Sequence, residues 1–182
     1  GEKLLIFLRD VVESGPLQPL YGIGGERHVP EEMLPHLSGY LGNGHVRVGN
    51  AAALQAQHDL MGEVVLCLET MLTDPRIAYR DPRPYFPLLK RLVEDAIRLA
   101  PEPDTGIWEF RTVLKNHTFS RAMCWVAIHR GALLARRLGY EAEAREWEQI
   151  AERERTIVLE RGYQPHLGFF TQGLDGQSPD AA

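Results

Sequence analysis

The chain has 182 residues, of which 44% are apolar and 25% are charged, and its formal net charge is −5. This balance is typical of one soluble globular domain that can bury a core. Acidic and basic residues are mixed along the chain, so no basic stripe indicates a nucleic-acid partner. No apolar run approaches the ~18 residues of a membrane span, and the start shows no signal-peptide pattern. We therefore expect a cytoplasmic protein with no membrane partner.

Cysteine and histidine usage argues against a disulfide framework and against a metal site. Cys67 and Cys124 each lie in an apolar helical run, where we expect small buried side chains with free thiols. None of the seven histidines has a second ligand at the spacing of a metal site. The glycine-rich stretch "YGIGGE" lacks the preceding strand and the Lys of a phosphate-binding loop. We expect no metal and no organic cofactor.

The first fifty residues contain one helix and a long irregular segment. An apolar stripe from Leu4 to Val12 predicts a helix, which "ESGP" ends. More than thirty residues rich in Gly, Pro and His follow. A loop of this length is uncommon in a compact domain unless it is functional. We expect an excursion with one helical turn near Pro30–Leu34.

The rest of the chain is helical by its periodicity. Asn50 is expected to cap a helix that runs to about Leu72, and three more helices are expected over Pro84–Ala100, Thr118–Leu138 and Glu141–Arg161. Helices that are sparse in charge alternate with amphipathic ones. This alternation predicts inner and outer helix pairs in a layered, all-α fold with little β structure.

The stretch "PDTGIWEFR" carries the clearest candidate for chemistry. Glu109 lies between Trp108 and Phe110, and burial against apolar surface would raise the pKa of its carboxyl group. A carboxylic acid that stays protonated at neutral pH suits general-acid cleavage of a glycosidic bond, and Trp108 offers a flat face for a sugar ring. Alternatively, Glu109 is an ordinary acid at the start of a helix, where the macrodipole favours a negative charge. The local residues leave both interpretations open.

Five stretches together resemble a known family. They are "LQPLYGIGGERHVPEE", "VRVGNAAALQAQHDLMGEVV", "PDTGIWEFR", "HTFSRAMCWVAIHRGALLARRLG" and "GFFTQGLDGQSPDAA". In order and in spacing they are similar to successive blocks of glycoside hydrolase family 15, the glucoamylase-like enzymes, whose bacterial members include trehalases. The resemblance covers nearly the whole chain.

This resemblance implies an (α/α)6 barrel, a helical toroid of six inner and six outer helices. It also implies inverting hydrolysis of an α-glucosidic bond at a non-reducing glucose. The family's general acid falls on Glu109, Trp108 would line the pocket of the released glucose, and the carbonyl of Ile107 would face a sugar hydroxyl. Arg111 recurs in bacterial members and is a further candidate for substrate binding. Phe110 stands where many fungal members have a second Glu, so this chain resembles the bacterial branch.

The resemblance also implies that parts of the site lie outside the chain. An inverting enzyme needs a second carboxylate roughly 6.5–9.5 Å from the acid. The family's base lies in a later block, and the Arg-Asp pair that grips glucose lies before Gly1. Arg9 and Asp10 are expected to be surface residues instead. We therefore expect residues 1–182 to be one central segment, about half of a glucoamylase-like catalytic domain, and to be inactive alone.

Three matters stay open at this point. The substrate carries a non-reducing α-glucose, but starch-like glucans, maltooligosaccharides, isomalto-linkages and trehalose all fit that description. A non-catalytic helical module for carbohydrate binding or regulation is the alternative function, and a plain helical scaffold is a third. The half barrel would expose apolar faces of its inner helices, which predicts a homo-oligomer.

Overall fold

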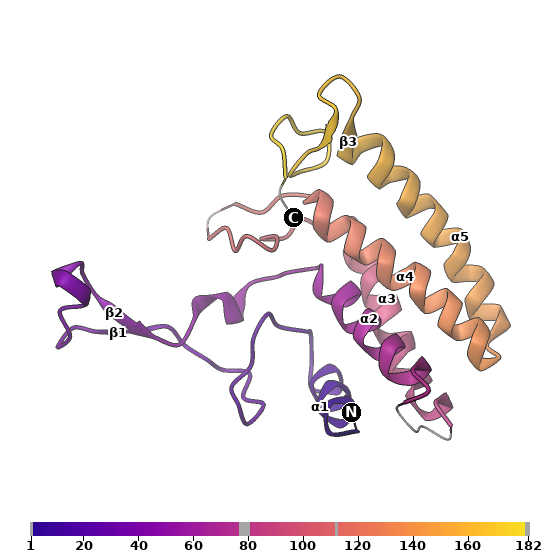
Figure 1. The fold of residues 1–182 in the computed structure, drawn as a ribbon, viewed down its shortest axis with the longest axis horizontal. Helices are drawn as coiled ribbons and strands as arrows, with labels where there is room; N and C mark the ends of the chain where they lie inside the picture. Colours follow the sequence, from indigo (N-terminus) through magenta and orange to yellow (C-terminus); the bar gives the residue numbers. More distant parts are fainter. Residues whose placement is uncertain (1, 77–80, 112, 181–182) are drawn as a thin grey trace.

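The computed structural model describes residues 2–76, 81–111 and 113–180. Within these ranges the fold is all-α, as predicted, and its only strands form two short antiparallel pairs. The helices are α1 (Glu2–Glu13), α2 (Leu60–Thr73), α3 (Phe86–Leu99), α4 (Thr118–Leu138) and α5 (Glu141–Ile157). The strands are β1 (Glu32–Leu34), β2 (Val46–Val48), β3 (Tyr163–Gln164) and β4 (Phe169–Phe170). Figure 1 shows α2 to α5 lying side by side.

Helix α4 lies at the centre of the helical body, in contact with α2, α3 and α5, while α1 packs on α3. Its bounds are those that the sequence predicts. Gly139 ends it in a left-handed conformation, with φ 91°, and donates its N–H to carbonyls in the last turn. The expected Glu141–Arg161 helix is also present, with its last residues in a π-helical turn over Val158–Gly162.

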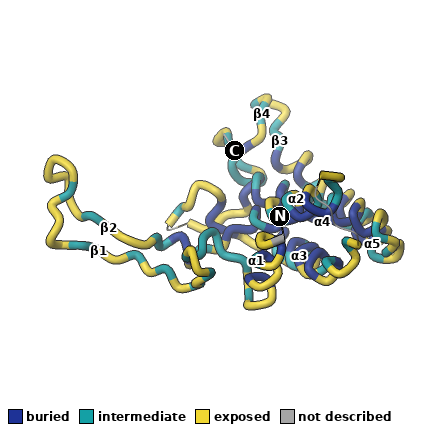
Figure 2. Tube along the Cα trace, turned by 60° about the horizontal axis from the view of Figure 1, so that its bottom comes forward, coloured by how far each residue is buried: buried dark blue, intermediate teal, exposed yellow. Residues whose placement is uncertain are grey.

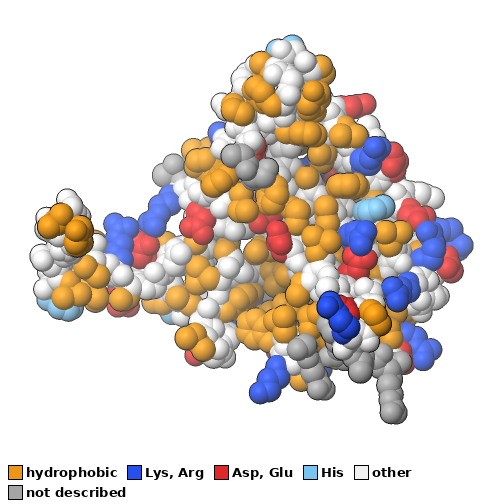
Figure 3. Space-filling view, viewed as in Figure 1, with side chains coloured by type: hydrophobic (Ala, Val, Ile, Leu, Met, Phe, Trp, Pro, Cys, Tyr) orange, Lys and Arg blue, Asp and Glu red, His pale blue; other side chains and the backbone are white. Residues whose placement is uncertain are grey.

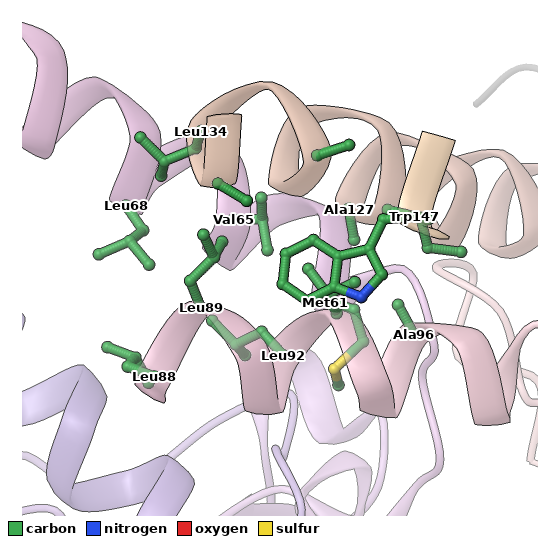
Figure 4. Close-up of a cluster of buried hydrophobic side chains, with 14 of the residues drawn as sticks. Met61, Val65, Leu68, Leu88, Leu89, Leu92, Ala96, Ala127, Leu134 and Trp147 are labelled. Carbon is green, nitrogen blue, oxygen red and sulfur yellow. The ribbon is translucent and has the colours of Figure 1, made fainter. Parts of the chain in front are cut away.

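The core is built from apolar side chains of α2, α3, α4 and α5, and Figure 4 shows part of it. Leu68 from α2, Leu89 and Leu92 from α3, and Ile128 from α4 are fully buried. Trp147 reaches into this cluster from α5, whose other faces are highly charged. The alternation of sparse and amphipathic helices is therefore consistent with the packing. No helix of the described ranges is long and apolar enough to cross a membrane.

The helix predicted from Asn50 is interrupted. Asn50 does cap a helical segment, by accepting the N–H of Ala52 at 2.9 Å, but that segment is a 3-10 helix that ends at Leu54. Helix α2 begins only at Leu60. The intervening backbone bonds elsewhere: the carbonyl of Ala56 accepts the N–H of Thr105 at 3.0 Å. Hydrogen bonds to a distant segment thus replace those that a continuous helix would make.

The helical turn predicted near Pro30–Leu34 is wrong, because Glu32–Leu34 form strand β1. This strand pairs antiparallel with β2, with Met33 opposite Arg47. We call residues 29–50, which include both strands, the arm. The arm extends away from the helices in Figure 1, and most of it is exposed in Figure 2. A strand of three residues is too short to show an alternating apolar pattern, so the sequence does not reveal this pairing.

The predictions for the cysteines and for Arg9 and Asp10 are confirmed in outline. Both cysteines are free; Cys124 is buried, and Cys67 is half-buried rather than buried. Burial raises the pKa of the Cys124 thiol to about 12, so it stays protonated. Arg9 and Asp10 are exposed and form an ion pair with each other at 3.1 Å.

Candidate functional site

The candidate acid lies in a tight turn, not at the start of a helix. The N–H of Glu109 donates to the carbonyl of Gly106 at 3.1 Å, and both residues have left-handed backbones, with φ 67° at Gly106 and φ 55° at Glu109. The next helix, α4, begins at Thr118. The interpretation of Glu109 as a helix-start acid is therefore wrong. A left-handed conformation is uncommon and costly for a residue with a side chain, and such residues gather at functional sites.

Glu109 is not buried between its two aromatic neighbours in this structure. Glu109 is exposed, the Trp108 side chain is 51% exposed, and Phe110 turns toward His117 instead. No side chain of the described ranges donates a hydrogen bond to the carboxylate of Glu109. The turn thus presents this carboxylate to solvent beside a half-exposed indole. Ile107, which is 41% exposed, completes the same surface.

Two segments far along the chain hold this turn. The indole N–H of Trp108 donates to a carboxylate oxygen of Asp180 at 3.0 Å. On the other side, the Gln55 side-chain amide donates to the carbonyl of Glu109 at 3.3 Å. Thr105 donates through its hydroxyl to the carbonyl of Ala56 at 2.6 Å. The break between Leu54 and α2 therefore serves as a support for the turn.

Behind the turn lies a group of buried polar side chains. Asp104 is fully buried, and its Oδ2 accepts the backbone N–H of His58 at 2.9 Å and the hydroxyl of Ser120 at 2.7 Å. Asp59 is buried beside them. Burial, with the charges of Asp104 and Glu63 as smaller causes, raises the pKa of Asp59 to about 6. Burial also lowers the pKa of His58, against the opposing charge of Asp104.

Sequence reasoning missed this group. His58 and Asp59 are expected within the helix from Asn50, and Asp104 is expected in the turn after Pro103. His58 and Asp104 are 46 positions apart in the chain, and no local signal shows that the two meet. The clue that the sequence does hold is the run of three polar residues, Gln57, His58 and Asp59, within an otherwise apolar helical segment. Buried polar groups need hydrogen-bond partners, so such a run predicts a partner from a distant part of the chain.

The fourth predicted site residue, Arg111, pairs with the arm. Its guanidinium donates to both carboxylate oxygens of Glu31, at 3.3 and 3.0 Å, and Arg47 donates to the same carboxylate at 2.9 Å. Hydrogen bonding from Arg111 is the largest cause that holds the pKa of Glu31 below its ordinary value. Because a bidentate pair has a fixed geometry, Arg111 ties the start of the arm to the Glu109 turn.

The exposed carboxylate of the Glu109 turn can take part in acid–base chemistry. Within the described ranges, no group of three or more His, Cys, Asp or Glu side chains is placed to hold a metal ion. The structure brings Ile107, Trp108 and Glu109 together on one exposed turn, with Arg111 directed to Glu31. One carboxylate beside an apolar ring can donate a proton to a bound sugar, but hydrolysis with inversion needs a second carboxylate as well.

Comparison with known proteins identifies relatives along the entire chain. The family model for glycosyl hydrolases family 15 matches residues 7–182. A trehalase of Mycobacterium tuberculosis is 42% identical over 187 residues, which is 100% of this chain and 27% of the trehalase. A trehalase of Mycolicibacterium smegmatis is 42% identical over 93% of this chain and 25% of its own length.

A more distant relative, trehalase 2 of Sulfolobus acidocaldarius, is 30% identical over 100% of this chain and 32% of its own length. No solved structure matches. The chain thus spans about a quarter of the length of the mycobacterial relatives. The family match covers nearly all of this chain, and the five sequence blocks noted above all lie within it. The chain belongs to glycosyl hydrolase family 15.

Proposed function

We propose that the protein containing this chain hydrolyses α-glucosidic bonds, with trehalose as its substrate and with inversion at the anomeric carbon. The observation that carries the proposal is the Trp108–Glu109 pair, held in a left-handed turn with the carboxylate exposed. Membership of family 15 supports glycoside hydrolysis. Both mycobacterial relatives are trehalases, which supports trehalose among the α-glucosides.

In the proposed mechanism, Glu109 acts as the general acid. It donates its proton to the glycosidic oxygen as the C–O bond breaks, so that the second glucose leaves as a neutral alcohol. A carboxylate outside this chain removes a proton from water, which attacks the anomeric carbon from the opposite face. Trp108 would stack on the glucose ring, and the carbonyl of Ile107 would accept a sugar hydroxyl. Arg111 would border the site through its pair with Glu31.

The exposed state of Glu109 means that the proposed role needs further parts of the protein. A general acid of this kind works in apolar surroundings that keep it protonated, and Glu109 is exposed in this chain. We propose that the remaining helices of an (α/α)6 toroid, together with bound sugar, cover the Glu109 turn. Burial against Trp108 and the substrate would then supply the protonated form at neutral pH.

The stereochemistry of trehalose hydrolysis tests this proposal. Both anomeric carbons of trehalose have the α configuration, so inversion at one of them releases one β-glucose and one α-glucose at the earliest times. Proton NMR of the full-length protein with trehalose should show both anomers in equal amounts before mutarotation. Release of α-glucose alone would indicate retention, and binding without turnover would favour the carbohydrate-binding module instead.

A further inference from the structure

The Glu109 turn belongs to a loop whose two ends are pinned together. The N–H of Asp104 donates to the carbonyl of Lys115 at 2.9 Å, and the N–H of Lys115 donates to the carbonyl of Asp104 at 3.0 Å. Glu109 lies near the middle of the loop that this pair closes. These hydrogen bonds fix the two ends of the loop, but they do not fix the position or the orientation of the residues at its middle. The bonds from Trp108 to Asp180 and from Gln55 to the carbonyl of Glu109 help to set these, and so does the side chain that fills the loop.

The side chain that fills it is His117. A Cβ atom built on Gly106 would lie only 2.8–2.9 Å from three atoms of the His117 ring, closer than real Cβ contacts. The same ring is nearly parallel to Phe110, with ring centroids 5.8 Å apart and planes at 7°. His117 is 3% exposed. The imidazole therefore lies against both ends of the short segment that carries Glu109.

His117 is itself held by the helical body. It is the residue before α4, and it forms an antiparallel bridge with Gly173. The next residue, Thr118, donates its N–H to the carbonyl of Gln172 at 3.0 Å. Helix α4 packs on α2, α3 and α5, so the ring has a rigid base. Groups placed by such elements hold a catalytic side chain more accurately than a free loop does.

We propose that His117 is a positioning residue for Glu109: its ring separates Gly106 from Phe110 and thereby sets where the acid points. This inference rests on the proposed function of Glu109. The shape of the ring carries the effect, because Nε2 is buried and has no hydrogen-bond partner among the described residues. A flat apolar ring should therefore replace the imidazole, whereas a small side chain should not.

The experiment compares two substrates in the full-length protein. The glucose that leaves trehalose needs a proton from the acid, whereas fluoride leaves α-glucosyl fluoride with little protonation. Misplacement of an acid thus slows trehalose cleavage selectively. His117→Ala should lower kcat for trehalose by about 100-fold, with KM little changed and a much smaller loss on the fluoride. His117→Phe should restore most of the trehalose rate.

Val93→Ala is the matched control, since Val93 is fully buried in the core, where it lies against Gly131 in the middle of α4. It should lower the melting temperature but leave the ratio of trehalose to fluoride rates unchanged. If His117→Ala does not fold, Phe110→Ala tests the other side of the same ring, because Phe110 is only half-buried. An unchanged substrate ratio in the variant that folds would overturn the inference, as would a failure of His117→Phe to restore it.

Glu109→Gln, measured alongside, separates the two proposals. It should show the trehalose-selective loss even more strongly than His117→Ala does. If it shows none, the proposed function of Glu109 fails. If it shows the loss while His117→Ala keeps the ratio of the unaltered protein, the positioning role alone fails.

Discussion

The carboxylate of Asp104 accepts the hydroxyl of Ser120 at 2.7 Å inside the protein, and so joins the base of the Glu109 loop to the first turn of α4. The same oxygen accepts the N–H of His58 just before α2. One buried carboxylate therefore links three segments of the chain. We infer that the position of the candidate acid depends on this link. The Glu109 loop, the segment between Leu54 and α2, and helix α4 all meet at Asp104.

Ser120→Ala tests the contribution of this link to stability. The change leaves a buried carboxylate oxygen with one donor fewer, and we expect a loss of about 1–3 kcal/mol in the free energy of unfolding. Chemical denaturation followed by circular dichroism measures it. Ser38→Ala is the control, because Ser38 is exposed on the arm and should change stability little. Equal stability of the two variants would contradict the role given to Asp104.

The raised pKa of Asp59 predicts a dependence of stability on pH. The folded protein holds the Asp59 proton up to about pH 6, whereas an unfolded chain releases it near the ordinary value of 3.8. Stability should therefore fall as pH rises between these values, by at most about 3 kcal/mol from this group, and stay level above. Asp59→Asn cannot ionise and should lack this fall.

The informative quantity is the difference in unfolding free energy between the variant and the unaltered protein at pH 4, 5, 6 and 7.5. Groups common to both, such as His58, largely cancel in that difference. The variant should gain relative stability up to pH 6 and then stop gaining. The exposed Asp10, changed to Asn, should give a flat difference. A flat difference for Asp59→Asn as well would contradict the burial of an ionisable Asp59.

The ion pair of Arg111 with Glu31 predicts that the arm loosens when that carboxylate is lost. Glu31→Gln removes the charge to which Arg111 and Arg47 both bond, so residues 32–48 should become several-fold more accessible to proteases. Acid should have the same effect once the pH falls below the lowered pKa of Glu31, because protonation removes the same charge. Glu32→Gln changes an exposed neighbour and should leave cleavage unchanged.

Self-association of the isolated chain is predicted from its exposed apolar side chains. Leu4 and Ile6 on α1 are 45% and 41% exposed, and Leu133 on α4 is 39% exposed. Hydrophobic side chains also gather on the arm in Figure 3, where Met33, Tyr40 and Leu41 are exposed. Unpartnered apolar surface favours association. Light scattering should give a mass above 20.6 kDa, and a monomer at high concentration would contradict this.

The sequence predicts the helices well because their stability comes from a periodic apolar face. Helix α4 lies at the predicted residues, and Gly139 marks its end. The helix from Asn50 fails for a physical reason: the backbone at Ala56 and His58 bonds to Thr105 and Asp104, and helical propensity does not reveal such partners. The prediction for residues 30–34 fails for a similar reason. Strand β1 forms because the loop closes and brings it against β2, and the order of apolar and polar residues does not show this.

The candidate site is predictable only in part. The resemblance to family 15 selects Glu109 and Trp108, whereas the local residues alone also fit a helix-start acid. Neither the left-handed turn at Glu109 nor the ring of His117 beneath it is visible in the sequence, because both depend on contacts with residues outside the motif. Arg111 shows the same limit: its partner Glu31 lies 80 residues earlier in the chain.

The most direct test of the account is the rate of trehalose hydrolysis by the full-length protein with Glu109→Gln. Glutamine keeps the shape of the side chain but cannot donate a proton to the leaving oxygen. We predict that kcat/KM falls by about 100- to 10,000-fold with the melting temperature unchanged, while Glu102→Gln, on an exposed carboxylate nearby, has little effect. A near-normal rate for Glu109→Gln would contradict the assignment of Glu109 as the acid.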